Sequence, residues 1–581
     1  MNEIIIGIDL GTTNSEVAIV QNGKLTVIPI DGQKILPSAV SLADDNALLV
    51  GETAKNQYVL YPERTVLSIK RKMGSTEKVI LGEKSFTPQE ISALILKRLK
   101  RGAEEYLQSP VTKAVITVPA YFSDAQRQAT REAGELAGLE VVRMINEPTA
   151  AALAYDALNN EQKRVLVYDL GGGTFDVSIV SLQSQVVEVL ASTGNNHLGG
   201  DDFDAIIVDF IDQHLKTQGI EAKTTTTRAR IKRAAEIAKI ALSDHPFAVI
   251  SEEYLLDFEG KPYHLSLELS REKYEEMISP YIDETLSLVH TALDDAKFMT
   301  SDINEILLVG GSSRTPVITR RLAELFDCSP RFELDPELCV AMGAAIQAGI
   351  IAGEKCDSVL VDITPYTFGT SCIGMLHGTV YPNVFQPLIL KNTPIPVSKS
   401  EVFATFQDFQ EAVEVNVFQG EDEDALENIK IGQFLIEGLS HVPAGNQIIL
   451  SFKLDVDGIL HVSAKEKNTG YEKNIRINNA LPQLDQEEMA QAKQRIDDLF
   501  QNEGLEGLAS NVNQEHSKAL QLIQKAEKAL DIVSGEDQED LINMIEIIKD
   551  ILNANEDKKD KLSQHLEKLS DILFYLEIET A

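Results

Sequence analysis

The 581-residue sequence predicts a multidomain protein with an α/β part, then an antiparallel β-sandwich, then an α-helical bundle. Up to about residue 355, short apolar runs alternate with helical patterns, which is typical of α/β layers around a buried sheet. From Ile363 to Asn478, short alternating runs are separated by turn residues such as Asp457-Gly458, which favours a sandwich. After about Asp485, apolar residues recur at helical spacing. This length exceeds what one hydrophobic core supports, so several domains are expected.

The α/β part is predicted to occupy residues 1–356. Its strand candidates are Ile4–Asp9, Ala114–Val118, Arg164–Asp169, Val186–Ala191 and Glu305–Val309. Its helical patterns are Pro88–Gln108, Asp124–Ala137, Asp202–Lys216, Thr227–Ser243 and Arg271–Lys297. Strands that alternate with helices in this way predict a sheet covered by helices.

A short linker, residues 357–362, is predicted between the α/β part and the sandwich. It places Val359, Leu360 and Val361 between charged segments and ends at Asp362. Three neighbouring apolar side chains are not expected to remain in water, so this segment is predicted to dock on another part of the chain. The sandwich is assigned to residues 363–482. The helical lid is assigned to residues 483–581, where the apolar stripes indicate helix–helix packing.

The composition of the chain disfavours several classes of binding partner. The chain has 53 Lys and Arg against 90 Asp and Glu, a formal net charge of -37, which disfavours nucleic acid and anionic membrane surfaces. No apolar run reaches the roughly 20 residues that span a bilayer, and the N-terminus lacks the pattern of a signal peptide. The four cysteines form no C-x-x-C pair and are interpreted as reduced thiols. A cytoplasmic location is therefore expected.

The strongest internal feature is a repeated phosphate-binding pattern. Asp9-Leu-Gly-Thr-Thr13 and Asp169-Leu-Gly-Gly-Gly-Thr174 each follow a predicted strand. Glycine lets backbone N–H groups approach phosphate oxygens, and carboxylates can hold a hydrated Mg²⁺. One such turn alone is weak evidence, but two in related positions indicate a cleft between two related lobes. A third turn, Leu307–Arg314, supplies Gly310-Gly311 and an arginine that can stack on a purine. The sequence has no P-loop motif.

These motifs, in this order, carry a family resemblance. The segments DLGTTNS at 9–15, VPAYF at 118–122, INEPTAA at 145–151, DLGGGTFD at 169–176 and VGGSSR at 309–314 resemble the seventy-kilodalton heat-shock chaperones of the DnaK type. The resemblance runs from residue 4 to about 480 and extends more loosely into the helical tail. It implies an actin-like two-lobed ATPase, a sandwich that clamps peptides and a lid. The shortened lid and several departures are similar to the specialised HscC-like branch.

Carried over residue by residue, the resemblance implies a hydrolytic site. The catalytic residues are Lys70, Glu147, Thr174, Asp176, Asp9 and Asp169. The remaining nucleotide-binding residues are Gly11, Thr12, Thr13, Asn14, Gly171, Gly172, Gly173, Glu236, Lys239, Ser243, Gly310, Gly311, Ser312, Arg314 and Glu337. ATP and ADP are the expected nucleotides, with Mg²⁺ held by Asp9 and Asp169 mainly through water, and with K⁺. Ile240 and Glu337 depart from the family pattern, which leaves nucleotide affinity and the use of an exchange factor open.

The resemblance also implies residues for coupling and for peptide binding. Pro119, Arg127 and the linker Val359–Asp362 match the elements that connect the ATPase to the clamp, and Arg143 matches a contact for a J-domain cochaperone. Ile373, Phe403, Phe406, Val413 and Val415 match the peptide pocket and its arch. The sequence pattern alone favours ordinary core positions for them, and the resemblance favours the pocket for Val413 and Phe403. The segment Tyr381–Leu388 differs from DnaK and suggests a different choice of peptides.

The predicted function is an ATP-dependent chaperone. It binds short extended apolar segments of unfolded polypeptides, ATP opens the clamp and hydrolysis closes it, and the protein is mostly monomeric. Alternatives are a specialised regulatory holdase with few clients, a relative that binds ATP but barely hydrolyses it, a filament former, and a small-molecule kinase on the same actin-like fold. A kinase requires a base for a substrate hydroxyl and no clamp, so the sandwich pattern disfavours it.

Overall fold

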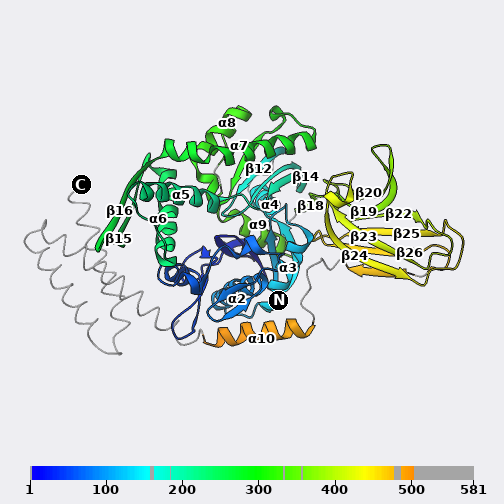
Figure 1. Ribbon diagram of the computed structural model, residues 1–581, viewed down its shortest axis with the longest axis horizontal. Coiled ribbons are helices and arrows are strands. Elements are labelled where there is room, and N and C mark those ends of the chain that lie inside the picture. The colour runs from blue at the N-terminus through cyan, green and yellow to red at the C-terminus, as the bar shows by residue number, and fades with distance from the viewer. Residues whose placement is uncertain are drawn as a thin grey trace, which may run out of the picture. The chain divides into compact units, whose positions relative to one another are not determined.

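The computed structural model describes residues 3–157, 162–183, 185–331, 334–354, 358–470, 472–476 and 486–502. The chain divides into two compact units, Met1–Ile496 and Asp497–Ala581, and nearly all described residues belong to the first. Figure 1 follows this unit along the chain, with the two α/β lobes in blue to green and the sandwich in yellow.

The first lobe is built on a sheet with the strand order β11-β10-β1-β2-β3, in which β4 (Leu36–Pro37) pairs with β2. The other strands are β1 (Ile5–Leu10), β2 (Asn14–Gln21), β3 (Lys24–Val27), β10 (Lys113–Val118) and β11 (Glu140–Asn146). Strand β1 runs antiparallel to β2 and parallel to β10. Because helices cover both faces of such a sheet, β1 is almost wholly buried and reads as a continuous apolar run.

The second lobe repeats this arrangement, with the order β17-β12-β13-β14-β18-β21. Its strands are β12 (Lys163–Leu170), β13 (Phe175–Gln183), β14 (Val186–Asn195), β17 (Glu305–Val309), β18 (Val359–Ile363) and β21 (Pro394–Ile395). Strand β12 is antiparallel to β13 and parallel to β17, as β1 is to β2 and β10. The internal repeat predicted from the two Gly-rich turns is therefore confirmed as a repeat of topology.

Helices pack around the two sheets. They are α1 (Glu52–Gln57), α2 (Pro88–Leu107), α3 (Asp124–Leu136), α4 (Glu147–Asp156), α5 (Gly200–Thr217), α6 (Thr225–Asp244), α7 (Arg271–Ala296), α8 (Pro316–Phe326) and α9 (Cys339–Ile351). The five predicted helices are found with ends within two residues of the predicted positions.

Small residues allow α9 to lie deep between the lobes. A Cβ added at Gly343 would lie 1.8 Å from the carbonyl oxygen of Ala150 on α4. A Cβ added at Gly7 on β1 would lie 2.1 Å from the amide nitrogen of Ala345. These backbones approach each other more closely than any side chain permits, so α4, α9 and β1 form one rigid layer beneath the cleft.

The sequence did not predict the hairpin of β15 (Phe247–Phe258) and β16 (Lys261–Ser270), which forms a separate two-stranded sheet. Buried and exposed residues alternate along β15, because one face packs on the lobe and the other does not. Strand β14 continues to Asn195, beyond the predicted end at Ala191.

The sandwich consists of two four-stranded sheets, β20-β19-β23-β24 and β22-β25-β26-β27. Its strands are β19 (Phe368–Leu376), β20 (Thr379–Ile389), β22 (Val397–Ala404), β23 (Ala412–Gln419), β24 (Ile429–Glu437), β25 (Gln447–Leu454), β26 (Leu460–Glu466) and β27 (Glu472–Arg476). Inward-facing apolar residues of both sheets form one core. The Asp457-Gly458 turn joins β25 to β26, as predicted.

The linker residues form β18, which pairs in parallel with the edge strand β14. The register places Val359 opposite Val186, Leu360 opposite Val187 and Val361 opposite Glu188. The linker thus completes the sheet of the second lobe and then continues into the sandwich.

The predicted lid begins with α10 (Gln486–Asn502), and its later helices lie outside the described residues. None of the helices in the described residues is long and apolar enough to cross a membrane. The described cysteines Cys328, Cys339 and Cys372 are free thiols, and Cys356 lies outside the described residues.

Candidate functional site

A cavity of about 590 Å³ lies between the two lobes. Most residues predicted from the three Gly-containing turns and from α6 line it: Asp9, Gly11, Thr12, Thr13, Asn14, Lys70, Glu147, Asp169, Gly171, Gly172, Thr174, Glu236, Lys239, Ser243, Gly310, Gly311, Ser312, Arg314 and Glu337. Gly173 and Asp176 lie outside the cavity wall, although Asp176 faces Asp169 across the β12–β13 pair. The volume suits one nucleotide-sized ligand.

The two repeated turns face each other across this cavity. A Cβ added at Gly172 would lie 1.9 Å from the Thr13 hydroxyl, and one at Gly173 would lie 2.8 Å from the Thr12 methyl group. Glycine is therefore required here for a close approach of the two turns. Their exposed backbone N–H groups and threonine hydroxyls can surround a phosphate chain from two sides.

Lys70 is buried and forms an ion pair with Glu147 at the start of α4. It follows Ser68, whose φ of 53° is in the left-handed region that non-glycine residues rarely adopt. Burial alone lowers the pKa of Lys70, but Glu147 and Asp9 outweigh that effect, so the pKa is raised and the ammonium stays charged. The site thus holds one fixed positive charge among several carboxylates.

Burial and neighbouring carboxylates raise the pKa of three aspartates in this region even though Lys70 lowers it. Burial and the charge of Glu147 raise the pKa of Asp9 to about 7, although Lys70 and a 2.7 Å hydrogen bond from Thr117 oppose this. Burial and Glu147 also raise the pKa of Asp176 to about 7, and burial raises that of Asp169 well above its usual value. Buried carboxylates in excess over cations are suited to a bound divalent ion.

A magnesium ion held through water fits this arrangement. Among the described residues, no three His, Cys, Asp or Glu side chains are close enough together to hold a metal ion by themselves. Asp9 and Asp169 end the first strands of the two lobes and both face the cavity. They can bind the water shell of an ion whose other ligands are phosphate oxygens.

Proton release should accompany nucleotide binding. A cation stabilises the ionised carboxylate, so below pH 7 binding of Mg²⁺-nucleotide must displace protons from Asp9 and Asp176. We expect calorimetry in two buffers of different ionisation enthalpy to give more released protons at pH 6 than at pH 8. The nucleotide phosphates also release protons, so the test compares wild type with Asp176→Asn. At pH 6 the variant should release fewer protons than wild type on binding Mg²⁺-nucleotide. Equal release by both proteins at pH 6 would contradict the prediction.

Sequence reasoning missed Glu16, which also lines the cavity. It lies opposite Asp9 in the β1–β2 pair and is only 2% exposed. Burial, followed by the charges of Asp9 and Glu337, raises its pKa well above the usual value. Glu16 lies in β2, which was not among the predicted strands, and its sequence neighbourhood gives no sign that it faces the cavity.

The opposite end of the cavity has the residues predicted to hold the nucleoside. Arg314 donates to Asp335 at 2.8 Å, and Asn14 donates to Glu337 at 3.2 Å. Lys239 donates to the Gly200 carbonyl at 3.1 Å and forms a 2.9 Å ion pair with Asp204. These contacts fix polar groups around the mouth of the cavity.

Glu236 has a partner that the sequence did not reveal. It accepts a 2.8 Å hydrogen bond from Lys55, and this ion pair joins α1 of the first lobe to α6 of the second. Both side chains are partly exposed. The ion pair therefore connects the two lobes at a residue that lines the cavity.

Lys55→Ala should accelerate nucleotide release. A partly exposed ion pair contributes about 0.2–1 kcal/mol, which corresponds to roughly 1.5- to 5-fold in a rate. Stopped-flow dissociation of a fluorescent ADP analogue measures this rate. Lys223→Ala is a matched control, because Lys223 pairs with the neighbouring Glu221 on an exposed loop. Unchanged release from Lys55→Ala would show that the pair does not restrain the lobes.

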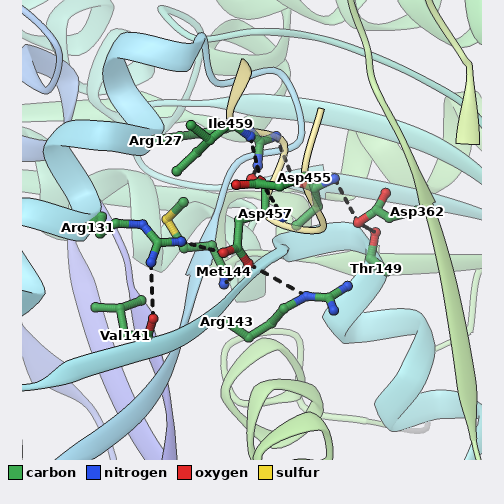
Figure 2. A network of polar contacts seen from close by, with 11 residues as sticks. Arg127, Arg131, Val141, Arg143, Met144, Thr149, Asp362, Asp455, Asp457 and Ile459 are labelled. Carbon is green, nitrogen blue, oxygen red and sulfur yellow. Dashed lines mark hydrogen bonds and ion pairs between the residues drawn. The ribbon is translucent and has the colours of Figure 1, made fainter. Parts of the chain in front are cut away.

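Arg127 lies at the centre of a polar network between the first lobe and the sandwich (Figure 2). It is buried and donates to the carbonyl oxygens of Ala120 (3.0 Å) and Asp457 (3.4 Å) and to Asn146 Oδ1 (2.7 Å). Asn146 in turn donates to linker residue Asp362 at 2.9 Å. Arg127 is thus linked to both the linker and the sandwich turn.

Asp457, which sequence analysis treated only as a turn residue, contacts three residues of the lobe on two elements, α3 and β11. Its carboxylate accepts a 2.9 Å hydrogen bond from the Met144 amide, pairs with Arg131, and lies 3.7 Å from Arg143. Asp455 shapes the turn by accepting from the amides of Asp457 and Ile459. Arg143 is therefore engaged with the sandwich.

The residues predicted for peptide binding differ in exposure. Ile373 and Phe406 are 51% and 73% exposed, Phe403 and Val413 are half-buried, and Val415 is 5% exposed within the sandwich core. Tyr381–Leu388 forms most of β20, an edge strand. Ile373 and Phe406 are thus exposed apolar side chains of the sandwich, whereas Val415 belongs to its core.

Comparisons with known proteins assign the family. The family described as "Hsp70 protein" matches residues 5–80 and 76–577. The chain is 45% identical over 570 residues to "Chaperone protein DnaK" of Thermotoga neapolitana, covering 95% of this chain and 94% of the relative. It is 43% identical over 592 residues to the protein of the same name from Thermosipho africanus, covering 98% and 97%. The chain therefore belongs to the Hsp70 family of ATP-dependent chaperones, whose members are ATPases.

Proposed function

We propose that this chain binds extended apolar segments of unfolded polypeptides in its sandwich and releases them when ATP binds between the lobes. The observation that carries this proposal is the chain of contacts from Asn146, which precedes the cavity residue Glu147, through Arg127 to Asp457 of the sandwich. A backbone segment that lies along a sandwich can form strand-like hydrogen bonds while its side chains enter an apolar pocket. Ile373, Phe403, Phe406, Val413 and Val415 are the proposed contacts.

For hydrolysis, we propose that Lys70 and Glu147 orient the attacking water. Lys70 offsets charge on the terminal phosphate, while Thr174 donates to it. Asp9 and Asp169 hold the water shell of Mg²⁺, which neutralises the phosphates when bound, and Asp176 lies beside them and beside a proposed K⁺ site. Arg314 stacks on the adenine, and Glu236, Lys239, Ser243 and Glu337 surround the nucleoside.

We further propose that Pro119, Arg127, Asp362 and the linker strand report the nucleotide state to the sandwich. This requires two arrangements of the linker that both sites can bias. A J-domain cochaperone is proposed to act at Arg143, which must then exchange Asp457 for the cochaperone. The proposed domains are residues 1–356, 357–362, 363–482 and 483–581. A mostly monomeric protein, a cytoplasmic location and the HscC-like branch stay predictions.

Peptide release tests the function directly. We expect a fluorescent apolar peptide to bind the ADP-loaded chain tightly and to dissociate at least tenfold faster after ATP is added, as anisotropy measures. The specialised holdase predicts the same kinetics with few peptides bound on an array. Peptide affinity that ATP does not change would contradict the proposed coupling, and ATP hydrolysis that needs a small hydroxyl acceptor would favour a kinase.

A further inference from the structure

Tyr366 lies between the linker strand β18 and the first sandwich strand β19, and its side chain reaches the first lobe. Its hydroxyl donates to the carbonyl oxygen of Tyr121 at 2.6 Å. The two rings lie 4.5 Å apart between centroids, with an interplanar angle of 41°. The side chain of Tyr366 packs against the sandwich core, so the ring moves with the sandwich.

Tyr121 also contacts the carboxylate of Asp176 through its amide. The amides of Ala120 and Tyr121 donate to the two carboxylate oxygens of Asp176, each at 3.1 Å. Asp176 is almost completely buried. A single residue thus binds Asp176 through its N–H group and the sandwich through its C=O group.

The turn that contains Tyr121 is also held from the lobe itself. Asn196 donates to the Tyr121 carbonyl at 2.7 Å, and Arg127 donates to the Ala120 carbonyl at 3.0 Å. A carbonyl oxygen has two acceptor sites, so Asn196 and Tyr366 together fill those of Tyr121. Loss of the Tyr366 hydroxyl therefore leaves no buried group without a partner, and the fold should tolerate it.

We propose that Tyr366 is a positioning residue for ATP hydrolysis. Its hydroxyl transmits the docking of the sandwich to Asp176 through the backbone of Tyr121, whose C=O and N–H groups belong to adjacent peptide groups. While the sandwich is docked, this bond fixes the turn so that both oxygens of Asp176 accept backbone N–H groups and are withheld from water and ions. When the sandwich leaves, the turn loosens and Asp176 becomes available. The proposal rests on the coupled function proposed above and assigns a route within it.

A structural role of the Tyr366 ring and the proposed role of its hydroxyl predict different effects of Tyr366→Phe. A purely structural role resides in the stacked rings, which Tyr366→Phe preserves. The proposed role resides in the hydroxyl, which Tyr366→Phe removes. A neutral hydrogen bond of ordinary strength corresponds to roughly 2- to 12-fold in an equilibrium. We therefore expect single-turnover ATP hydrolysis by Tyr366→Phe without peptide to be about threefold faster than wild type.

The stimulation of hydrolysis by saturating peptide should fall by the same factor, while the Kd for ATP stays unchanged. Hydrogen exchange gives a readout independent of activity. With ATP bound, the amides of Ala120 and Tyr121 should exchange faster in Tyr366→Phe than in wild type. Tyr263→Phe is the control, because its hydroxyl donates to Gln218 at 2.9 Å on a different part of the chain.

A double variant tests the role of Tyr366 separately from the proposed coupling of ATP to peptide release. In an Asp457→Ala chain, whose sandwich is expected to undock, adding Tyr366→Phe should have no further effect on hydrolysis or exchange. Unchanged stimulation and unchanged exchange in Tyr366→Phe alone would overturn the role of Tyr366. If wild type itself shows no stimulation by peptide, the proposed coupled function fails instead. An equal effect of Tyr366→Phe with and without Asp457 would place the hydroxyl outside the docking route and also overturn the proposal.

Discussion

Lys70→Ala should reduce single-turnover ATP hydrolysis by at least about 100-fold while nucleotide still binds. Removing one preorganised charge or donor from a phosphoryl-transfer or oxyanion site typically costs on the order of 10²–10³ in rate. Lys70 is a buried cation at the cavity, and its ammonium pairs directly with Glu147, which lines the same cavity. The loss therefore falls on the transition state more than on nucleotide binding.

Two further variants control for the loss of a nearby lysine and for the stability of the fold. Lys72→Ala removes a neighbouring lysine that pairs with the exposed Glu77, so it should hydrolyse ATP like wild type. Lys70→Ala leaves Glu147 buried without its cation, which destabilises the fold. The double variant Lys70→Ala/Glu147→Gln removes that unpaired charge and should remain folded but inactive. Wild-type hydrolysis by a folded Lys70→Ala protein that binds ATP would exclude the catalytic assignment.

The phosphate-binding end of the cavity could be predicted from sequence because its signals are local. Each Gly-containing turn spans about six residues and combines a strand end, glycines and a threonine. The chemistry of a phosphate cradle depends on the backbone of those same residues. The repeated topology of β1–β2 and β12–β13 then brings the two turns together. Lys70 and Glu147 carry no such local signal, and only family resemblance identified them.

The residues that connect the parts of the chain could not be predicted in this way. Lys55 and Glu236 are 181 positions apart, Tyr366 and Tyr121 are 245 apart, and Asp457 and Met144 are 313 apart. Each residue has an ordinary local explanation, such as a helix surface for Lys55 or a hairpin turn for Asp457. Their roles arise only from tertiary packing, on which local periodicity carries no information.

In the sandwich, the alternation of apolar and polar residues predicted which side chains share a strand face. It did not predict how deeply each side chain is buried. Val413 and Val415 lie on the same face of β23, yet Val413 is half-buried and Val415 is 5% exposed. Val415 belongs to the buried core, whereas Val413 packs against it and stays partly buried. A period of two cannot distinguish these positions.

Asp457→Ala should abolish the release of peptide by ATP. The variant loses the bond from the Met144 amide, the ion pair with Arg131 and the attraction of Arg143. A largely buried charge left without its partner costs about 3–5 kcal/mol, so the docked arrangement should become rarer by more than 100-fold. ATP can still bind between the lobes, because Asp457 lies outside the cavity wall.

The expected measurement is peptide dissociation followed by anisotropy. Wild type should release peptide at least tenfold faster with ATP than with ADP, and Asp457→Ala should release it at the ADP rate in both states. Asp422→Ala is the matched control, since its carboxylate accepts from the Asp424 amide within the sandwich and does not reach the lobe. It should behave like wild type.

A double-mutant cycle identifies the contact that carries the coupling. If Arg131 acts through Asp457, then Arg131→Ala should show a similar defect, and combining it with Asp457→Ala should add little. Additive effects would mean that the two side chains act on separate elements. Normal ATP-driven release of peptide by Asp457→Ala would show that the linker strand paired with β14 suffices for coupling. The network around Arg127 would then only stabilise the docked sandwich.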